Sequence, residues 1–154
     1  MLPCLTTARM TLTPATPADS ADLAALEADA LVMRHLVGAD YLQPRGHDPE
    51  VLAARLRDSG VFIGWFALFD DGQVNGLRQG EIGYRLHHAF WGQGYGTEGV
   101  ATLVDLAFTR LGFDLLRAEV AAANTGSRRV LEKAGFEKAG HSQNGEVIYD
   151  RRPT

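Results

Sequence analysis

Residues 91–99 read Trp-Gly-Gln-Gly-Tyr-Gly-Thr-Glu-Gly, so four glycines stand within nine positions. This segment separates a strand pattern over 81–86 from a strongly periodic helix pattern over 100–111. Because glycine has no side chain to obstruct a guest, backbone N–H groups can converge there, and the start of a helix adds unpaired donors and positive dipole. The segment therefore predicts a site for a phosphate or pyrophosphate, and hence a nucleotide-like cofactor.

The apolar periodicity on either side of this segment predicts a mixed α/β sheet. We expect strands over 5–12, 61–69, 81–86, 115–121, 136–139 and 146–151, helices over 16–30, 100–111 and 124–134, and loops over 38–50 and 70–80. The strand, helix and strand between 81 and 121 imply a parallel crossover, and the remaining strands are expected to be antiparallel.

Residues 51–57 fit two interpretations. Their alanines, leucines and arginines favour a helix by propensity, but Asp58-Ser59-Gly60 forms a turn signal that leads directly into 61–69. We therefore expect a β-hairpin. Because 61–69 is apolar on both faces, it is expected to be a central strand.

Size and charge limit the classes of function. The chain has 154 residues, and this length predicts a single domain over 1–154. Its net charge of −4 and pI near 5.7 argue against a nucleic-acid partner. Cys4 is the only cysteine, so no internal disulfide can form, and a cytoplasmic location is expected. The longest apolar run, 61–69, is far shorter than the roughly 20 residues of a membrane helix, so no membrane partner is expected.

Two cofactor classes compete for the glycine-rich segment. Gly94-x-Gly96-x-x-Gly99, with Glu119 twenty residues further on, imitates the dinucleotide motif of a nicotinamide-dependent oxidoreductase. In that fold, however, the first glycine of the motif directly ends the strand, whereas here residues 87–93 separate the end of the strand at Leu86 from Gly94. Too few residues follow Gly99 to build the repeated βαβ halves of such a fold.

Residues 86–96 and 124–136 together resemble the GNAT acetyltransferases, whose Q/R-x-x-G-x-G/A loop wraps the pyrophosphate of coenzyme A. Trp91 stands where that loop usually has Gln or Arg, as in the branch of ribosomal-protein N-terminal acetyltransferases. The blocks Glu81-Ile-Gly-Tyr-Arg-Leu86 and Asn124-x-x-Ser127 also resemble that branch. The resemblance implies a mostly antiparallel sheet with a V-shaped splay between the strands at 81–87 and 115–121. The second helix that the family usually has before the second strand is expected to be absent or shortened in this chain, which is a departure from the family pattern.

The same resemblance implies that the chain transfers the acetyl group of acetyl-CoA to a primary amine by direct attack, without a metal. The backbone of Leu86 and His87 would face the pantetheine amides, the glycine loop would hold the pyrophosphate, and Asn124 would reach the pantetheine arm. The residues implied for cofactor binding are Leu86, His87, Gly92, Gln93, Gly94, Tyr95, Gly96, Thr97, Asn124 and Ser127.

Acetyl transfer needs an uncharged amine. At pH 7 this costs roughly 1 kcal/mol for an α-amine and roughly 5 kcal/mol for a lysine amine. The resemblance implies that Glu81 is the base, acting through water, and that Ser127 acts as the acid, because Leu131 occupies the place of the tyrosine acid of many relatives. Protein N-termini and small-molecule amines both remain possible acceptors.

Simpler roles stand beside these. Asn124 could be a helix cap alone, Ser127 an exposed residue of a first helical turn, and Glu81 a salt-bridged strand residue. Arg128 and Arg129 are expected at the surface, and His141 and Tyr149 in ordinary packing rather than in the acceptor pocket. A non-catalytic acyl-CoA-binding module is the second functional hypothesis, and the sequence leaves monomer and homodimer open.

A metal site is not expected. His87 and His88 are the only adjacent histidines, and neighbouring strand residues point to opposite faces of a sheet.

Overall fold

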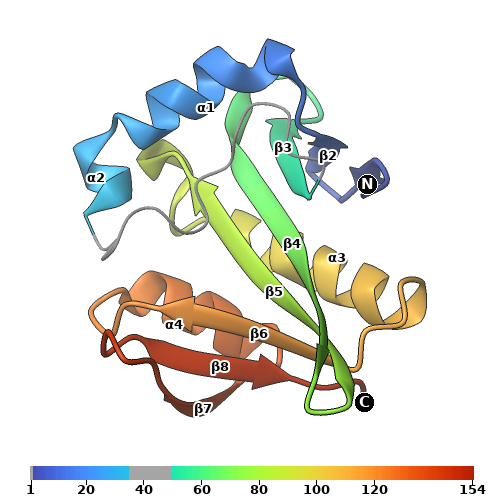
Figure 1. The fold of residues 1–154 in the computed structure, drawn as a ribbon. Coiled ribbons are helices and arrows are strands. Elements are labelled where there is room, and N and C mark those ends of the chain that lie inside the picture. Colours follow the sequence, from blue (N-terminus) through green and yellow to red (C-terminus); the bar gives the residue numbers. More distant parts are fainter. Residues whose placement is uncertain (1, 35–49) are drawn as a thin grey trace.

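The computed structural model describes residues 2–34 and 50–154. The elements follow in chain order (Figure 1): β1 (Leu5–Thr6), β2 (Met10–Pro14), a 3₁₀ turn (Pro17–Asp19), α1 (Ser20–Glu27), α2 (Ala30–Met33), β3 (Val51–Leu56), β4 (Phe62–Val74), β5 (Leu77–Leu86), a second 3₁₀ turn (His88–Phe90), α3 (Tyr95–Thr109), β6 (Leu115–Val120), α4 (Thr125–Lys133), β7 (Glu137–His141) and β8 (Val147–Arg151). The loop expected at 38–50 lies almost entirely outside the described residues.

The described strands form one sheet in the order β1-β2-β3-β4-β5-β6-β8-β7. Every neighbouring pair is antiparallel except β5 and β6, which are parallel and joined through α3. The expected mixed, mostly antiparallel sheet with one parallel crossover is confirmed, as is the hairpin of β3 and β4.

The parallel pairing of β5 with β6 is short. It is limited to Gln79–Leu115, Gly80–Leu116 and Glu81–Arg117. Beyond Glu81, β5 continues beside β4 as far as Leu86, while β6 continues beside β8 as far as Val120. The two strands therefore separate toward their carboxyl ends, which confirms the expected V-shaped splay.

Alternating side chains of β4 serve two cores. Phe66 and Leu68 belong to the larger core, which contains the buried face of α3. Trp65 and Ala67 point to the opposite face of the sheet, where they pack with Leu23 of α1. The strand is buried on both faces because helices cover both, so the expectation of a central strand is confirmed.

Helix α3 approaches the sheet closely because Gly99 has no side chain. A Cβ placed on Gly99 would lie 2.2 Å from ring carbons of Phe66. The helix begins at Tyr95 rather than near Val100, so Gly96 and Gly99 belong to its first turns instead of to a loop before it. This packing brings the start of α3 against the splayed end of β5.

The prediction of a loop over residues 70–80 is wrong. Strands β4 and β5 continue through this region as one long hairpin, and the chain reverses at Asn75-Gly76. Both residues have positive φ, 52° and 80°, which matches the Asn-Gly turn favoured in two-residue hairpins. Polar residues could continue the strands because this end of the hairpin projects into solvent.

Two N-terminal elements are shorter than predicted. The strand expected over 5–12 is divided at residues 7–9 into β1 and β2, which pair with each other. The helix expected over 16–30 ends at Glu27, because Asp29 caps a separate helix by accepting a bond of 2.9 Å from the Leu31 amide. That helix, α2, has four residues, in line with the expected shortened second helix. None of the helices within 2–34 and 50–154 is long and apolar enough to cross a bilayer.

Candidate active site

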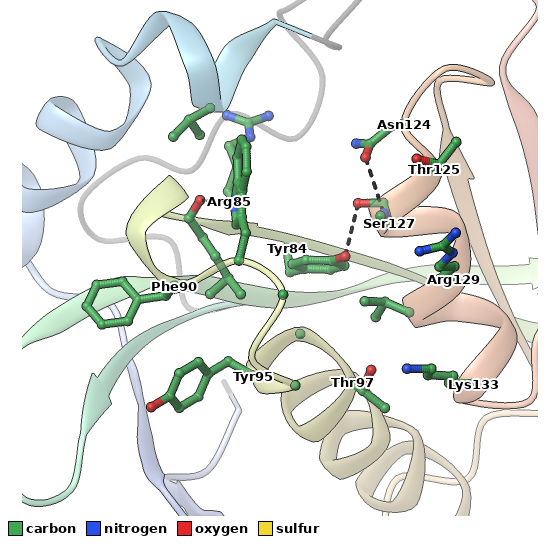
Figure 2. Close-up of a pocket in the computed structure, with 18 of the residues that line it drawn as sticks. Tyr84, Arg85, Phe90, Tyr95, Thr97, Asn124, Thr125, Ser127, Arg129 and Lys133 are labelled. Atoms are coloured by element: carbon green, nitrogen blue, oxygen red, sulfur yellow. Dashed lines mark hydrogen bonds between the residues drawn. The ribbon is translucent and has the colours of Figure 1, made fainter.

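A cavity of about 520 Å³ lies where the end of β5, the start of α3 and the start of α4 meet (Figure 2). Its wall contains most of the residues expected to bind a cofactor, although they come from three separate elements. These are Leu86, Gly92, Gly94, Tyr95, Gly96, Thr97, Asn124 and Ser127.

The start of α3 presents free backbone donors to this cavity. Gly94 caps the helix with φ +86°, a conformation that suits glycine, and its carbonyl accepts from the Glu98 amide. The N–H groups of the first turn have no partner within the helix, and the helix dipole adds partial positive charge there. An anion in the cavity would meet this positive end.

Arg9 holds the glycine loop in place from outside the cavity. Its Nη1 donates to the Gln93 carbonyl at 2.9 Å, its Nε pairs with Glu98 at 2.9 Å, and its guanidinium lies 3.9 Å from the centre of the Tyr95 ring. Although burial raises the pKa of Glu98, hydrogen bonds from Thr7 and Arg9 outweigh it and lower that pKa, which keeps the carboxylate charged. The loop therefore has a fixed shape before any ligand arrives.

Trp91 fastens the other side of the loop. Its Nε1 donates a hydrogen bond of 2.8 Å to the Leu86 carbonyl, and Gln93 Nε2 donates to the Ala89 carbonyl at 2.9 Å. Side chains thus bind the backbone of the loop to itself and to β5, and the cavity-facing amides remain available. Substitution of the usual Gln or Arg by Trp91 therefore leaves the backbone amides in place.

A hydroxyl pair lies at the junction of β5 and α4. Asn124 caps α4 by accepting from the Ser127 amide at 3.2 Å, and Ser127 Oγ lies 3.0 Å from the hydroxyl of Tyr84, as the dashed lines in Figure 2 show. Burial raises the pKa of Tyr84 to about 12, so this phenol stays protonated. Sequence reasoning missed Tyr84, although strand alternation places it on the same face as Ile82 and Leu86.

Four cationic side chains line the cavity: Arg34, Arg85, Arg129 and Lys133. Arg129 and Lys133 extend from α4 on the side opposite Thr97 (Figure 2). Arg128, by contrast, donates to the Tyr149 hydroxyl at 3.2 Å and the Ala122 carbonyl at 3.0 Å. The two adjacent arginines therefore divide into one structural residue and one cavity residue, which the sequence did not distinguish.

Glu81 lies at the base of the splay, at the last residue pair between β5 and β6. Burial raises its pKa to about 7, with further contributions from Asp71, Glu119 and Glu146, while Arg117 acts in the opposite direction. Glu81 lines neither the large cavity nor the smaller one described below. A carboxylate with this pKa can accept a proton near neutral pH.

A second cavity of about 80 Å³ lies between the separated parts of β5 and β6. Four residues line both cavities: Tyr84, Arg85, Asn124 and Ser127. Arg85 is nearly buried and bonds to both carboxylate oxygens of Glu27 in α1. The two cavities therefore meet at the hydroxyl pair.

Two residues expected in the cofactor site do not line the cavity. The His87 amide donates to the Ile63 carbonyl at 2.8 Å, so it cannot also donate to a ligand. Gln93 is absent from the cavity wall because its side chain turns back to Ala89 and its carbonyl accepts from Arg9. The expected packing role of Tyr149 agrees with the structure, where the residue is buried and its hydroxyl donates to Glu132 at 3.0 Å. The same expectation is wrong for His141, which is exposed because the side chains of the edge strand β7 mostly face solvent.

The argument that His87 and His88 point apart is wrong. The strand ends at Leu86, so alternation no longer applies, and the two rings stack with their centres 4.3 Å apart. Both rings approach Asp29, and possible ligand atoms of the three residues lie within 4.8 Å of one another. His87 Nδ1 already accepts from the Ala89 amide, which places the ring proton on Nε2, the atom that faces Asp29. A metal at Nε2 would have to displace this proton.

Comparison with known proteins places the fold and the site in a family context. The model of the acetyltransferase (GNAT) domain matches residues 9–137. The Probable N-acetyltransferase YjcK of Bacillus subtilis is 48% identical over 72 residues, which cover 47% of this chain and 40% of the relative. The Uncharacterized N-acetyltransferase p20 of Bacillus licheniformis is 40% identical over 68 residues, covering 44% of this chain and 37% of the relative. The match thus spans about two-fifths of the length of these relatives.

Solved structures agree over nearly the whole chain. An acetyltransferase from Agrobacterium tumefaciens superposes with a TM-score of 0.80 at 25% identity, covering 99% of this chain and 96% of that one. A ribosomal-protein-S5-alanine acetyltransferase from Vibrio fischeri superposes with a TM-score of 0.74 at 15% identity, covering 97% of this chain and 96% of that one. An aminoglycoside acetyltransferase solved in complex with coenzyme A superposes with a TM-score of 0.71 at 22% identity, covering 93% of this chain and 94% of that one.

Proposed function

This chain belongs to the GNAT acetyltransferases, and from that premise we propose that its residues 1–154 form one domain that transfers the acetyl group of acetyl-CoA to a primary amine. One observation carries the proposal. The amides at the start of α3 and the hydroxyl pair of Tyr84 and Ser127 open into the same cavity. A single ligand can therefore place a phosphate end at α3 and a reactive end at the splay.

The residues present fit coenzyme A in three ways. The cavity, at about 520 Å³, falls within the range typical of ligand pockets. The loop at Gly92, Gly94 and Gly96 leaves backbone N–H groups uncovered for a diphosphate, and such an anion gains roughly 0.3–2 kcal/mol from the helix dipole. Arg129 and Lys133 add positive charge for further phosphate on the α4 side.

Acetyl-CoA, when bound, supplies an acyl thioester that an uncharged amine can attack directly. In the reaction a C–N bond forms, the C–S bond breaks, and the amine loses one proton while the leaving thiolate gains one. Glu81 is proposed to take the amine proton through water, since a carboxylate with a pKa of about 7 is a base at neutral pH. Ser127 is proposed to protonate the thiolate from the junction of the two cavities, and the Tyr84 hydroxyl at 3.0 Å holds it there.

Two measurements on the whole chain test the proposal. Calorimetry with coenzyme A should show binding that is weakened by Arg129→Ala and unaffected by Arg152→Ala, an exposed arginine away from the cavity. Release of free thiol from acetyl-CoA should increase when primary amines are added. Absence of heat together with absence of amine-dependent thiol release would disprove the proposal.

A non-catalytic acyl-CoA-binding module is the second candidate. It is favoured by Leu131, a buried residue where many relatives have a tyrosine acid, and by the four-residue α2. Binding of coenzyme A without turnover of any amine would support this candidate over the enzyme. The dinucleotide interpretation of Gly94–Gly99 loses its basis, because the mostly antiparallel sheet is not the parallel one that this motif requires.

A further inference from the structure

The smaller cavity bears on the acyl group that the site can transfer. It lies between the separated parts of β5 and β6 and shares Tyr84, Arg85, Asn124 and Ser127 with the large cavity. Ser127 is the residue proposed to protonate the leaving sulfur. The acyl group attached to that sulfur must therefore lie at the junction of the two cavities, where the smaller one is open to it.

One side of the smaller cavity is apolar. It is formed by Ile82 of β5, Ala118 and Val120 of β6, and Leu131 of α4. All four residues are buried, and all belong to the larger core, on the face of the sheet that contains α3. A hydrocarbon chain placed against them would exchange water for an apolar surface, which is favourable.

The charged residues of this cavity lie toward the other face of the sheet. Arg85 is paired with Trp65 in the ladder of β4 and β5, and Trp65 belongs to the second core. Glu119 points away from the larger core, because side chains alternate along β6. Glu146 lies near Glu119, since burial together with the charge of Glu146 raises the pKa of Glu119. The cavity thus has an apolar side for a chain and a charged side from which a polar amine can approach.

Leu131 extends the apolar side up to the proposed acid. Many relatives have a tyrosine at this place, whose hydroxyl would make the wall polar. Ser127 and Leu131 are four residues apart in α4, so their side chains share one face of the helix. The apolar wall therefore begins next to the residue that meets the sulfur.

The size of the cavity limits the length of the chain. Its volume is about 80 Å³. By the same measure a single water-sized group needs roughly 10–15 Å³, so there is room for more than the one methyl group of an acetyl. The cavity is closed at its far end, because Ile82 and Ala118 directly follow Glu81 and Arg117, the last residue pair between β5 and β6. A long chain would have to open this pairing.

Given the proposed function, we infer that the site transfers propionyl and butyryl groups as well as acetyl, with the added carbon atoms against Ile82, Ala118 and Leu131. The bonds exchanged are the same for each donor. A C–N bond forms and the C–S bond breaks, the amine proton passes to Glu81 through water, and the thiolate takes a proton from Ser127.

Acyl-CoA donors of increasing chain length test this inference on the full chain. Thiol release from acetyl-, propionyl-, butyryl- and hexanoyl-CoA is compared with one fixed amine, the better of propylamine and a tripeptide with a free N-terminal alanine. Burial of one methylene group is worth about fourfold, so kcat/KM for propionyl-CoA should exceed that for acetyl-CoA by about this factor. Hexanoyl-CoA overfills the cavity and should be used at least about tenfold less well than propionyl-CoA.

Two results of this comparison would overturn the inference and leave the proposed function intact. The first is a kcat/KM for propionyl-CoA that does not exceed that for acetyl-CoA. The second is use of hexanoyl-CoA as efficiently as propionyl-CoA, which would mean that the closed cavity does not receive the chain.

Two variants connect the preference for chain length to the cavity wall. Ala118→Val adds methyl groups at the wall and should lower the ratio of kcat/KM for propionyl-CoA to that for acetyl-CoA about tenfold. Leu131→Ala enlarges the cavity and should raise the ratio for hexanoyl-CoA to propionyl-CoA about tenfold. If both ratios stay unchanged in these variants, the cavity does not receive the acyl chain and the inference fails.

Leu106→Ala is the matched control for Leu131→Ala. Leu106 is also buried, but it lies in α3 and lines neither cavity. The control should lower Tm by a similar amount and leave both ratios as they are in the wild type. An equal change of the ratios in Leu106→Ala would assign them to a general loosening of the core and overturn the inference.

If neither amine is acylated, the proposed function fails, and calorimetry still decides the inference. The Kd of propionyl-CoA should be about fourfold lower than that of acetyl-CoA, and Ala118→Val should remove the difference. Equal Kd values in the wild type would overturn the inference. Binding of free coenzyme A in the same experiment reports separately on the large cavity.

Discussion

The indole nitrogen of Trp91 lies 2.8 Å from the carbonyl oxygen of Leu86, so the side chain that opens the glycine loop is bonded to the last residue of β5. The indole remains 41% exposed, and its contribution is thus positional rather than a matter of core packing. The loop and the strand form two of the walls of the large cavity, and α4 contributes another. The hydrogen bond sets the distance between the loop and the strand.

Trp91→Phe should loosen this connection and weaken coenzyme binding. Phenylalanine keeps an aromatic ring but cannot donate, and a hydrogen bond of this kind contributes about 0.5–1.5 kcal/mol. We expect calorimetry to show a Kd for coenzyme A raised about 2- to 10-fold, with little change in Tm. Leu31→Ala, at another exposed apolar residue, should leave the Kd unchanged. An unaltered Kd in Trp91→Phe would show that the loop keeps its position without this bond.

Glu81→Gln should change stability and activity in opposite directions. The pKa of Glu81 in the folded protein is about 7, above its ordinary value of 4.5, so the folded state binds the proton more tightly than the unfolded chain. The resulting stability is complete below pH 4.5 and is lost as the pH rises through 7. Since Gln mimics the protonated form, the variant should be more stable than the wild type by about 1–3 kcal/mol at pH 8, allowing for partial exposure, and equal to it at pH 4.

The pH dependence of activity completes this prediction. In the wild type, kcat/KM should rise as the pH increases through about 7, because Glu81 must lose its proton to act as a base. In Glu81→Gln this rise of kcat/KM with pH should disappear, and kcat/KM should fall at least about 100-fold. Urea unfolding at pH 4 and pH 8 and a pH–rate profile provide the measurements. If kcat/KM of Glu81→Gln still rose with pH near 7, another group would be the base.

Gly99→Ala should destabilise the fold. The added Cβ would meet ring carbons of Phe66 at 2.2 Å, and neither the helix nor the buried ring can move without disturbing the core. The expected loss is about 1–3 kcal/mol in the free energy of unfolding. Gly126→Ala in α4 is the matched control, because its Cβ has no neighbour closer than 3.9 Å, and alanine should there add about 0.5–1 kcal/mol. Equal effects at both sites would contradict the close contact of α3 with β4.

Arg129→Ala and Lys133→Ala should weaken coenzyme binding in a salt-dependent manner. Both side chains line the cavity from α4 and are exposed, so their attraction for phosphate is screened by ions. We expect each variant to raise the Kd about 3- to 10-fold in 50 mM salt and by much less in 500 mM salt. A loss of affinity independent of salt would point to a change in the shape of the cavity instead of to lost charge.

Much of the fold could be predicted from periodicity, and the exceptions have local causes. The Asn75-Gly76 turn is a strong hairpin signal, but the polar residues beside it concealed the strands, since that end of the hairpin has no core to cover. The interruption at Asp29 could not be seen because aspartate is compatible with a helix interior as well as with a cap. The start of α3 at Tyr95 was missed because glycines inside a helix are unusual, and only the contact of Gly99 with Phe66 explains them.

The candidate site was predictable where the proposed ligand contacts involve the backbone. The glycine loop and Asn124 are local motifs, and the structure brings them to one cavity. Tyr84 and Arg85 were not predicted, because their places in the cavity walls depend on the separation of β5 from β6, a feature of tertiary structure. Likewise, only the fold distinguishes Arg128, bound to Tyr149, from Arg129, which faces the cavity.

The pairing between β5 and β6 is three residue pairs long. It joins the N-terminal strands β1 to β5 to the C-terminal strands β6 to β8, and we call these two parts of the sheet its lobes. A ligand that touches the start of α3 and the side chains of α4 fastens these lobes together, so its binding energy is added to their cohesion. Hydrogen exchange should consequently slow in β6 and β8 when coenzyme A is present, although these strands lie mostly outside its cavity. The molecule would then become more rigid across the short β5–β6 pairing whenever coenzyme A is bound.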